Sequence, residues 1–237
     1  MQESIDHPVE VFQSDVAGTL LLLEQCRKHN VRLVFVSSCM VYDAAAADGA
    51  IYENHPVKAA SPYAAAKLSA EHLVMSYHHA YGLPSVVLRP FNTYGPFQKS
   101  NSEGGVVSVF LEREISGGEL KIYGDGTQTR DLLYVEDCAR FIAEAGFSEK
   151  AVGRTINAGT GADISVNELA KVICRDGSRI KHVQHIHPQS EIMKLCCDNS
   201  RAKALLGWEP ATSLEDGISK TRRWLQKRSQ PLLSTDF

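Results

Sequence analysis

The sequence predicts an α/β fold built on a doubly wound parallel sheet, and two observations support this fold class. Two nearly continuous apolar runs, "VRLVFVSS" (31–38) and "PSVVLRPFNTYGP" (84–96), are rich in β-branched residues, which is typical of parallel strands buried on both faces. Segments with apolar residues at helical spacing precede each run, and alternating helices and strands favour a parallel sheet.

The first helix is expected over residues 9–29, where Lys28 and His29 stand in the last turn. The second is expected over residues 62–80. Ser61 is suited to the N-cap, Pro62 to the first helical position and Gly82 to the end.

The composition changes after residue 96. Glycine turns, short strands and two helices are expected up to residue 152, and "RTINAGTG" (154–161) returns to a strand followed by glycines. Amphipathic helices are expected at 165–176 and 215–228, with the polar strand-like stretch 180–188 between them. We therefore predict a sheet domain (1–96 plus strand 153–160) and a smaller mixed α/β lobe (97–152 and 161–237).

Composition excludes several classes of function. The net charge of −3 and the absence of a basic stripe argue against nucleic acid, and the aliphatic cluster at 19–23 is too short to span a bilayer. The polar first residues do not resemble a signal peptide, and the six cysteines lack metal-ligand spacing, so we expect reduced thiols in a cytoplasmic protein. Strand alternation places His182 opposite His185 and His187, which argues against a metal site there.

Tyr63 and Lys67 are the first candidate functional pair. Residues four apart share a helix face, and an ammonium beside a phenol lowers the pKa of the phenol toward the range of a general base. Alone, such a pair is more often structural than catalytic. Ser37 and Ser38 change this balance, because they end a buried parallel strand, where doubly wound folds bind their ligands.

Five motifs together resemble one family. "VSSCMVYD", "SPYAAAKLSAE", "LRPFNTYGP", "IYGDGTQTRDLLYVED" and "NAGTG" follow the order and spacing of extended short-chain dehydrogenases/reductases, specifically the NAD-dependent nucleotide-sugar epimerases and dehydratases with a Rossmann-like fold. The resemblance implies that Tyr63 takes the proton of the sugar 4-hydroxyl while hydride passes to NAD. It implies that Lys67 lowers the pKa of Tyr63 and holds the nicotinamide ribose, and that Ser38 binds the reacting oxygen.

The resemblance also implies binding residues. Besides the trio, Phe91 and Asp15 are expected at the cofactor, with Asp15 in place of the family's usual asparagine. A nucleotide-diphosphate sugar is the expected partner. The resemblance implies that Asn92 and Arg130 bind its diphosphate. It also implies that Ile122 and Tyr123 line its base, with both side chains pointing inward.

Three further positions bear on the substrate site. His187 stands where the family usually has a second arginine, Leu195 falls near a position that gates substrate size, and Arg130 has a local pair with Asp131 as its structural alternative. The family's dimers imply a homodimer through helices 9–29 and 62–80.

The type of reaction depends on the two residues after Ser38. Family dehydratases carry an acidic residue there, whereas this chain has Cys39 and Met40. Methionine transfers no proton, so we favour C4 epimerisation. Dehydration is the alternative, because a cysteine can in principle transfer one.

The glycine-rich turn that binds a dinucleotide pyrophosphate is absent from this sequence. The chain begins where it matches the family beyond its first strands, so we expect an N-terminally incomplete sheet with weak NAD binding. Met1 is then expected to be an internal residue of a longer protein. A non-catalytic remnant and a partner chain that supplies the missing part are the alternatives.

Overall fold

A computed structural model describes residues 2–46, 49–99, 105–185, 188 and 191–229. Its central sheet contains β1 (Leu33–Val36), β2 (Ser85–Pro90) and β6 (Thr155–Ala158), in the order β1-β2-β6 and all parallel. The three strands follow one another in chain order, and their parallel pairing requires a crossover connection between each strand and the next, as in a doubly wound sheet. The predicted fold class is confirmed.

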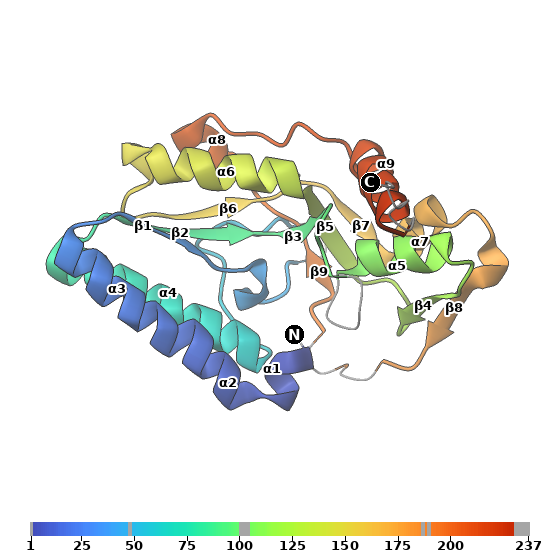
Figure 1. Cartoon of the computed structure of the whole chain (residues 1–237), viewed down its shortest axis with the longest axis horizontal. Coiled ribbons are helices and arrows are strands. Elements are labelled where there is room, and N and C mark those ends of the chain that lie inside the picture. The colour runs from blue at the N-terminus through green and yellow to red at the C-terminus, as the bar shows by residue number, and fades with distance from the viewer. Residues whose placement is uncertain (1, 47–48, 100–104, 186–187, 189–190, 230–237) are drawn as a thin grey trace, which may run out of the picture.

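Helices cover both faces of this sheet (Figure 1). Helices α3 (Gly18–His29) and α4 (Pro62–Tyr81) lie on one face, while α6 (Val135–Phe147) and α8 (Ser200–Leu206) lie on the other. Alternation along β2 sorts the side chains: Val86 and Leu88 pack with Phe141 and Trp208, whereas Val87 packs with Leu23 and Val74. Burial on both faces explains why β2 reads as a continuous apolar run.

The predicted helix 9–29 is interrupted. It follows α1 (Gln2–Asp6) and starts as α2 (Pro8–Phe12), passes through a π-helical turn at Gln13–Ala17 and continues as α3. Helix α4 agrees closely with its prediction: the Ser61 hydroxyl accepts a hydrogen bond from the Ala64 N–H at 3.2 Å, and Gly82 ends the helix at φ 66°.

The smaller lobe contains two further sheets. One joins β3 (Asn92–Tyr94), β5 (Thr129–Tyr134), β7 (Asp163–Ser165) and β9 (Lys194–Leu195), and the other pairs β4 (Leu120–Tyr123) with β8 (Ile180–Val183). Helices α5 (Val106–Ile115), α7 (Val166–Ile173) and α9 (Leu214–Ser229) enclose its core, and short 3₁₀ helices lie at Glu149–Ala151 and Gly177–Arg179. Strands β7 and β9 and helix α8 have too few residues for a sequence period to reveal them.

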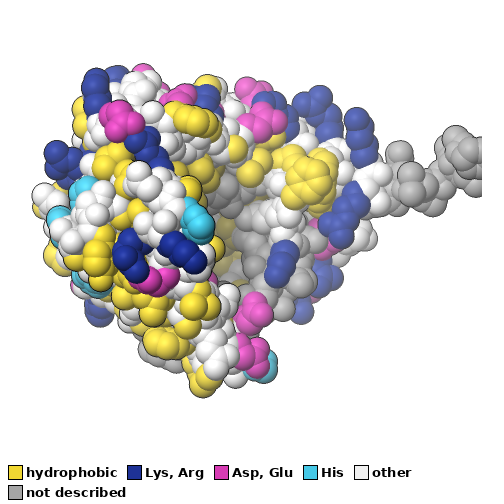
Figure 2. Space-filling model, turned by 60° about the vertical axis from the view of Figure 1, so that its left-hand side comes forward, with side chains coloured by type: hydrophobic (Ala, Val, Ile, Leu, Met, Phe, Trp, Pro, Cys, Tyr) yellow, Lys and Arg dark blue, Asp and Glu magenta, His cyan; other side chains and the backbone are white. Residues whose placement is uncertain are grey.

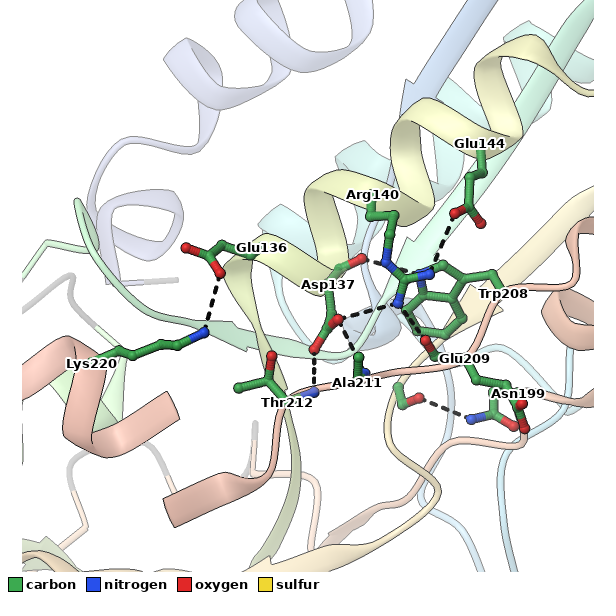
Figure 3. A network of polar contacts seen from close by, with 11 residues as sticks. Glu136, Asp137, Arg140, Glu144, Asn199, Trp208, Glu209, Ala211, Thr212 and Lys220 are labelled. Carbon is green, nitrogen blue, oxygen red and sulfur yellow. Dashed lines mark hydrogen bonds and ion pairs between the residues drawn. The ribbon is translucent and has the colours of Figure 1, made fainter. Parts of the chain in front are cut away.

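Helix α6 lies in the range predicted for the smaller lobe, yet it shares a core with the central sheet. Its first turn also fixes the segment between α8 and α9 (Figure 3). The Asp137 carboxylate accepts the N–H groups of Ala211 at 3.1 Å and Thr212 at 2.9 Å, and its carbonyl accepts the Trp208 indole at 3.1 Å. Among the described helices, none is long and apolar enough to cross a membrane.

A buried ion pair joins α4 to the central sheet. The Arg89 guanidinium of β2 donates both from Nε, at 2.9 Å, and from a terminal nitrogen to the Glu71 carboxylate of α4. Both side chains are nearly inaccessible, at 8% and 5% exposed. The same guanidinium lies 4.6 Å from the centre of the Tyr42 ring, on the loop after β1. One arginine therefore holds a helix, a strand and a loop in register.

Replacing Glu71 tests this arrangement. Glu71→Ala leaves the Arg89 charge buried without its partner, so we expect a loss of about 3–5 kcal/mol in the free energy of unfolding, measured with urea. Glu209→Ala removes an exposed pair with Lys203 and should cost less than about 1 kcal/mol. Equal losses in the two variants would contradict the role of the buried pair.

Candidate functional site

The three residues expected to be catalytic meet at the carboxyl end of β1. Ser38 follows the strand and caps the 3₁₀ helix Cys39–Val41, where its hydroxyl accepts from the Met40 N–H at 3.2 Å. Tyr63 lies in the first turn of α4 and Lys67 one turn later. Ser38 and Tyr63 are close enough for their side chains to hydrogen bond. The geometry thus brings together residues that are 25 positions apart (63 minus 38) in the sequence.

The pKa of Tyr63 corrects one expectation. We expected Lys67 to lower this pKa, but the structure raises it above its ordinary value. Burial is the main cause, the Asp15 carboxylate adds to it, and hydrogen bonding with Ser38 opposes it. The lysine does not offset burial, because its ammonium is directed elsewhere.

Lys67 faces Asp15. Its Nζ lies 3.5 Å from the Asp15 carboxylate, 5.5 Å from the centre of the Phe35 ring and 5.8 Å from the centre of the Tyr63 ring. Both partners of the ion pair are largely buried, at 17% and 23% exposed. Asp15 lies within the π-helical turn, a kind of irregularity that is frequent at functional sites.

Cys39 and Met40 follow Ser38. The Cys39 side chain is 2% exposed, and burial raises the pKa of its thiol to about 12. The thiol is therefore protonated at neutral pH, so it holds a proton but cannot accept one. All six cysteines of the chain are free thiols.

Phe91 and Asn92 lie where β2 passes into β3. The Phe91 ring is 2% exposed and packs in the cluster that contains Cys39 and Tyr42, so its contact with a cofactor stays a prediction. The amide oxygen of Asn92 and the hydroxyl of Ser37 are both buried, and neither has a hydrogen-bond partner among the described residues. Unpaired polar atoms of this kind are costly unless a ligand or water pairs them.

Arg130 is held by a carboxylate, but not by Asp131, the partner in the structural alternative. One terminal nitrogen of Arg130 binds Glu191, and the other donates to the carbonyls of Thr129 at 2.7 Å and Ile192 at 2.8 Å. Glu191 also lies 2.7 Å from His185. The local pair with Asp131 is wrong, because that carboxylate points to the other side of β5.

Asp131 instead fixes the turn after β6. It is fully buried and accepts from the Thr160 N–H and hydroxyl at 2.7 Å, the Gly161 N–H at 2.9 Å and the Cys197 N–H at 3.1 Å. Gly159 is required nearby, because a Cβ there would lie 2.3 Å from the Cys197 side chain.

The orientation expected for Ile122 and Tyr123, the residues predicted to bind the base, is wrong for Tyr123. We expected Ile122 and Tyr123 both to point inward, but neighbouring residues of a strand face opposite sides. Ile122 is 1% exposed in the core of the smaller lobe, whereas Tyr123 is 45% exposed. Leu195 is also fully buried, and His187 lies outside the described residues.

Sequence reasoning missed the residues that position the trio. Glu71 follows Lys67 by four residues, so Tyr63, Lys67 and Glu71 share one stripe of α4, a spacing that marks Glu71 as a partner for a buried charge. Its partner Arg89 stands inside an apolar strand, where an isolated charge requires pairing.

The residues present fit one end of a dinucleotide. Ser38, Tyr63 and Lys67 line one site, and the unpaired Ser37 and Asn92 atoms lie on the same connections. The sequence offers no residues for the pyrophosphate, because no G-x-x-G-x-x-G turn follows a strand in it. No group of three or more His, Cys, Asp or Glu side chains in the described part of the chain is arranged to hold a metal ion.

Sequence comparison identifies relatives over nearly the whole chain. The chain is 35% identical to the UDP-glucose 4-epimerase of Mycolicibacterium smegmatis, over 97% of this chain and 74% of the relative. It is 31% identical to a dTDP-glucose 4,6-dehydratase of Xanthomonas campestris pv. campestris, over 94% of this chain and 69% of the relative.

Solved structures are similar to this chain over most of its length. Pal from Bacillus thuringiensis is 56% identical with a TM-score of 0.94, over 96% of this chain and 72% of that one. UDP-glucose 4-epimerase from Thermotoga maritima, solved with UDP-glucose, is 31% identical with a TM-score of 0.88, over 96% and 74%. The Thermus thermophilus UDP-glucose 4-epimerase, a complex with NAD, is 31% identical with a TM-score of 0.85, over 94% and 73%.

A family model described as GDP-mannose 4,6 dehydratase matches residues 1–221. The match spans both the central sheet and the smaller lobe. The relatives above other than Pal are named UDP-glucose 4-epimerase or dTDP-glucose 4,6-dehydratase. The chain therefore belongs to the GDP-mannose 4,6 dehydratase family of sugar-nucleotide enzymes.

Proposed function

We propose that this protein is an NAD-dependent nucleotide-sugar epimerase that acts at C4 of the sugar through a transient 4-keto intermediate. The observation that carries the proposal is the juxtaposition of Tyr63 and Ser38 at the carboxyl end of β1, with Lys67 one helical turn away. NAD, when bound, supplies the hydride acceptor at C4.

The protein's own residues handle the proton. Tyr63 removes the proton of the sugar 4-hydroxyl on oxidation and returns it on reduction, while Ser38 hydrogen bonds the same oxygen. Only the phenolate form of Tyr63 can accept this proton. Burial disfavours that form by raising the pKa of Tyr63, and the hydrogen bond with Ser38 favours it. Lys67 binds a ribose hydroxyl of the cofactor. Epimerisation further needs room for the ketosugar to turn over, so that hydride returns to the opposite face.

Cys39 and Met40 favour epimerisation over dehydration. Loss of water across two sugar carbons needs a base for one carbon and an acid for the leaving hydroxyl. Met40 exchanges no proton, and the Cys39 thiol remains protonated at neutral pH because burial raises its pKa to about 12. Cys39 is therefore suited only to the acid role, which keeps 4,6-dehydration as the second candidate.

The substrate proposed is a nucleotide-diphosphate sugar. Asn92 and Arg130 are the residues proposed for its diphosphate, since a guanidinium matches phosphate oxygens with two parallel hydrogen bonds. Glu191 already binds the Arg130 guanidinium, so a diphosphate must share or displace this carboxylate.

A homodimer is proposed through the helices at 9–29 and 62–80. Exposed apolar side chains on the first of these support it: Val9, Phe12, Leu20, Leu21 and Leu22 are between 39% and 69% exposed. Hydrophobic side chains gather among charged ones on the face that these helices form (Figure 2). The six free thiols support a cytoplasmic location.

Substitution of Tyr63 tests the reaction. The protein is incubated with NAD and a panel of UDP-, dTDP-, GDP- and CDP-sugars, and C4 inversion is followed by NMR. Tyr63→Phe should lower turnover by about 10²–10⁴-fold, because the proton acceptor is lost. Tyr81→Phe, an exposed tyrosine beside Arg27, should leave it unchanged. A 4-keto-6-deoxy product would instead assign the dehydratase, and failure to convert any sugar would contradict both candidates.

Substitution of Arg130 tests the diphosphate site separately. Arg130→Lys keeps the positive charge but loses the guanidinium's pair of parallel hydrogen bonds to phosphate oxygens. The affinity for UDP, measured by calorimetry, should therefore fall about 10–100-fold. Arg32→Lys, at the pair with Glu149, is the matched control and should bind UDP like the unchanged protein. A lowered melting temperature with unchanged affinity would show that Arg130 is only structural.

A further inference from the structure

Asp15 is the charged residue nearest to the proposed catalytic lysine. We propose that Asp15 is a positioning residue that acts on Tyr63 through Lys67: its carboxylate holds the ammonium aside and thereby sets the pH at which the phenol ionises. This inference rests on the proposed function only in taking Tyr63 as the group that exchanges the proton.

The backbone fixes Asp15 at this place. In the π-helical turn Gln13–Ala17, the Gly18 N–H donates to the Gln13 carbonyl, five residues earlier. The buried Thr19 hydroxyl donates to the Asp15 carbonyl at 2.5 Å. A π turn inserts one residue into a helix and rotates its side chains relative to a regular α-helix. The carboxylate consequently lies 3.5 Å from the Lys67 ammonium of the neighbouring helix.

The Lys67 ammonium lies between the Asp15 carboxylate and the ring of Tyr63. Its ammonium is in the ion pair with Asp15, and the Tyr63 ring centre lies 5.8 Å away. A carboxylate that neutralises the ammonium removes the charge that would stabilise a phenolate. Asp15 also repels the phenolate directly, since it raises the pKa of Tyr63.

The other charged groups near α4 are engaged or distant. Tyr63 is influenced by Ser38 and Cys39 from the segment after β1 and by Asp15 from the π turn. Elsewhere on the elements that contact α4, Arg89 is bound by Glu71, Glu24 by Arg27 and Tyr77, and exposed Glu10 lies 3.8 Å from His7. Glu3 and Asp6 of α1 have exposed side chains and interactions of their own. Asp15 is therefore the carboxylate that acts on both the Lys67 ammonium and the pKa of Tyr63.

Asp15→Asn gives the test in the full 237-residue chain. Tyrosinate absorbance is titrated with pH, and the same titration of Tyr63→Phe in each background is subtracted to isolate Tyr63. Loss of the Asp15 carboxylate and release of the Lys67 ammonium both favour the Tyr63 phenolate. The midpoint of Tyr63 ionisation should therefore fall by about one pH unit. Asp43→Asn, at the pair with Lys58, is the matched control and should leave the midpoint in place.

A second background separates the two routes. If Asp15 acts through Lys67, Asp15→Asn in a Lys67→Met protein should shift the midpoint by less than half as much. An equal shift in both backgrounds overturns the route through Lys67. If Asp15→Asn causes no shift or an upward shift in the protein that retains Lys67, the whole proposal is overturned. Circular dichroism confirms folding of each variant, and Asp15→Ser repeats the test should the amide variant fail to fold.

The titration does not require turnover. A midpoint that falls in a protein that converts no sugar contradicts the proposed function and leaves this inference supported. Turnover with an unmoved midpoint contradicts this inference alone.

Discussion

The buried ion pair between Arg89 and Glu71 is the interaction on which the site depends. Removing two charges from water is costly, and the cost is offset only when their geometry is well satisfied. Here the guanidinium binds the carboxylate at two positions and also lies against the Tyr42 ring. The pair therefore allows little rotation of α4, and Tyr63, on the same stripe as Glu71, keeps its distance from Ser38.

Asp131 plays the corresponding role on the other side of the central sheet. A carboxylate that accepts hydrogen bonds from Thr160, Gly161 and Cys197 draws the turn after β6 and the end of β9 onto β5. Arg130, the residue before Asp131 in β5, forms its ion pair with Glu191. The Asp131 carboxylate therefore joins the turn after β6 of the central sheet to the smaller lobe, and it satisfies several donors, as a buried charge requires.

The chemistry of the trio is defined by what surrounds it. A tyrosine and a lysine one turn apart suggest a phenol made more acidic, yet burial and Asp15 raise the pKa of Tyr63 in this structure. In the proposed reaction Tyr63 must therefore lose its proton before it can accept one, and the hydrogen bond with Ser38 favours this loss. Cys39 is buried and its thiol stays protonated at neutral pH, which is the basis for proposing epimerisation over dehydration.

The sequence by itself determined the fold class, the order of its main elements and the membership of the trio, because buried parallel strands and capped helices leave strong local patterns. Ser61, Pro62 and Gly82 defined α4 almost to the residue. Only the tertiary structure decided which charges meet: Lys67 with Asp15, and Arg130 with Glu191 rather than Asp131. Such pairings depend on side chains that the fold brings together from distant segments, and no local period records them.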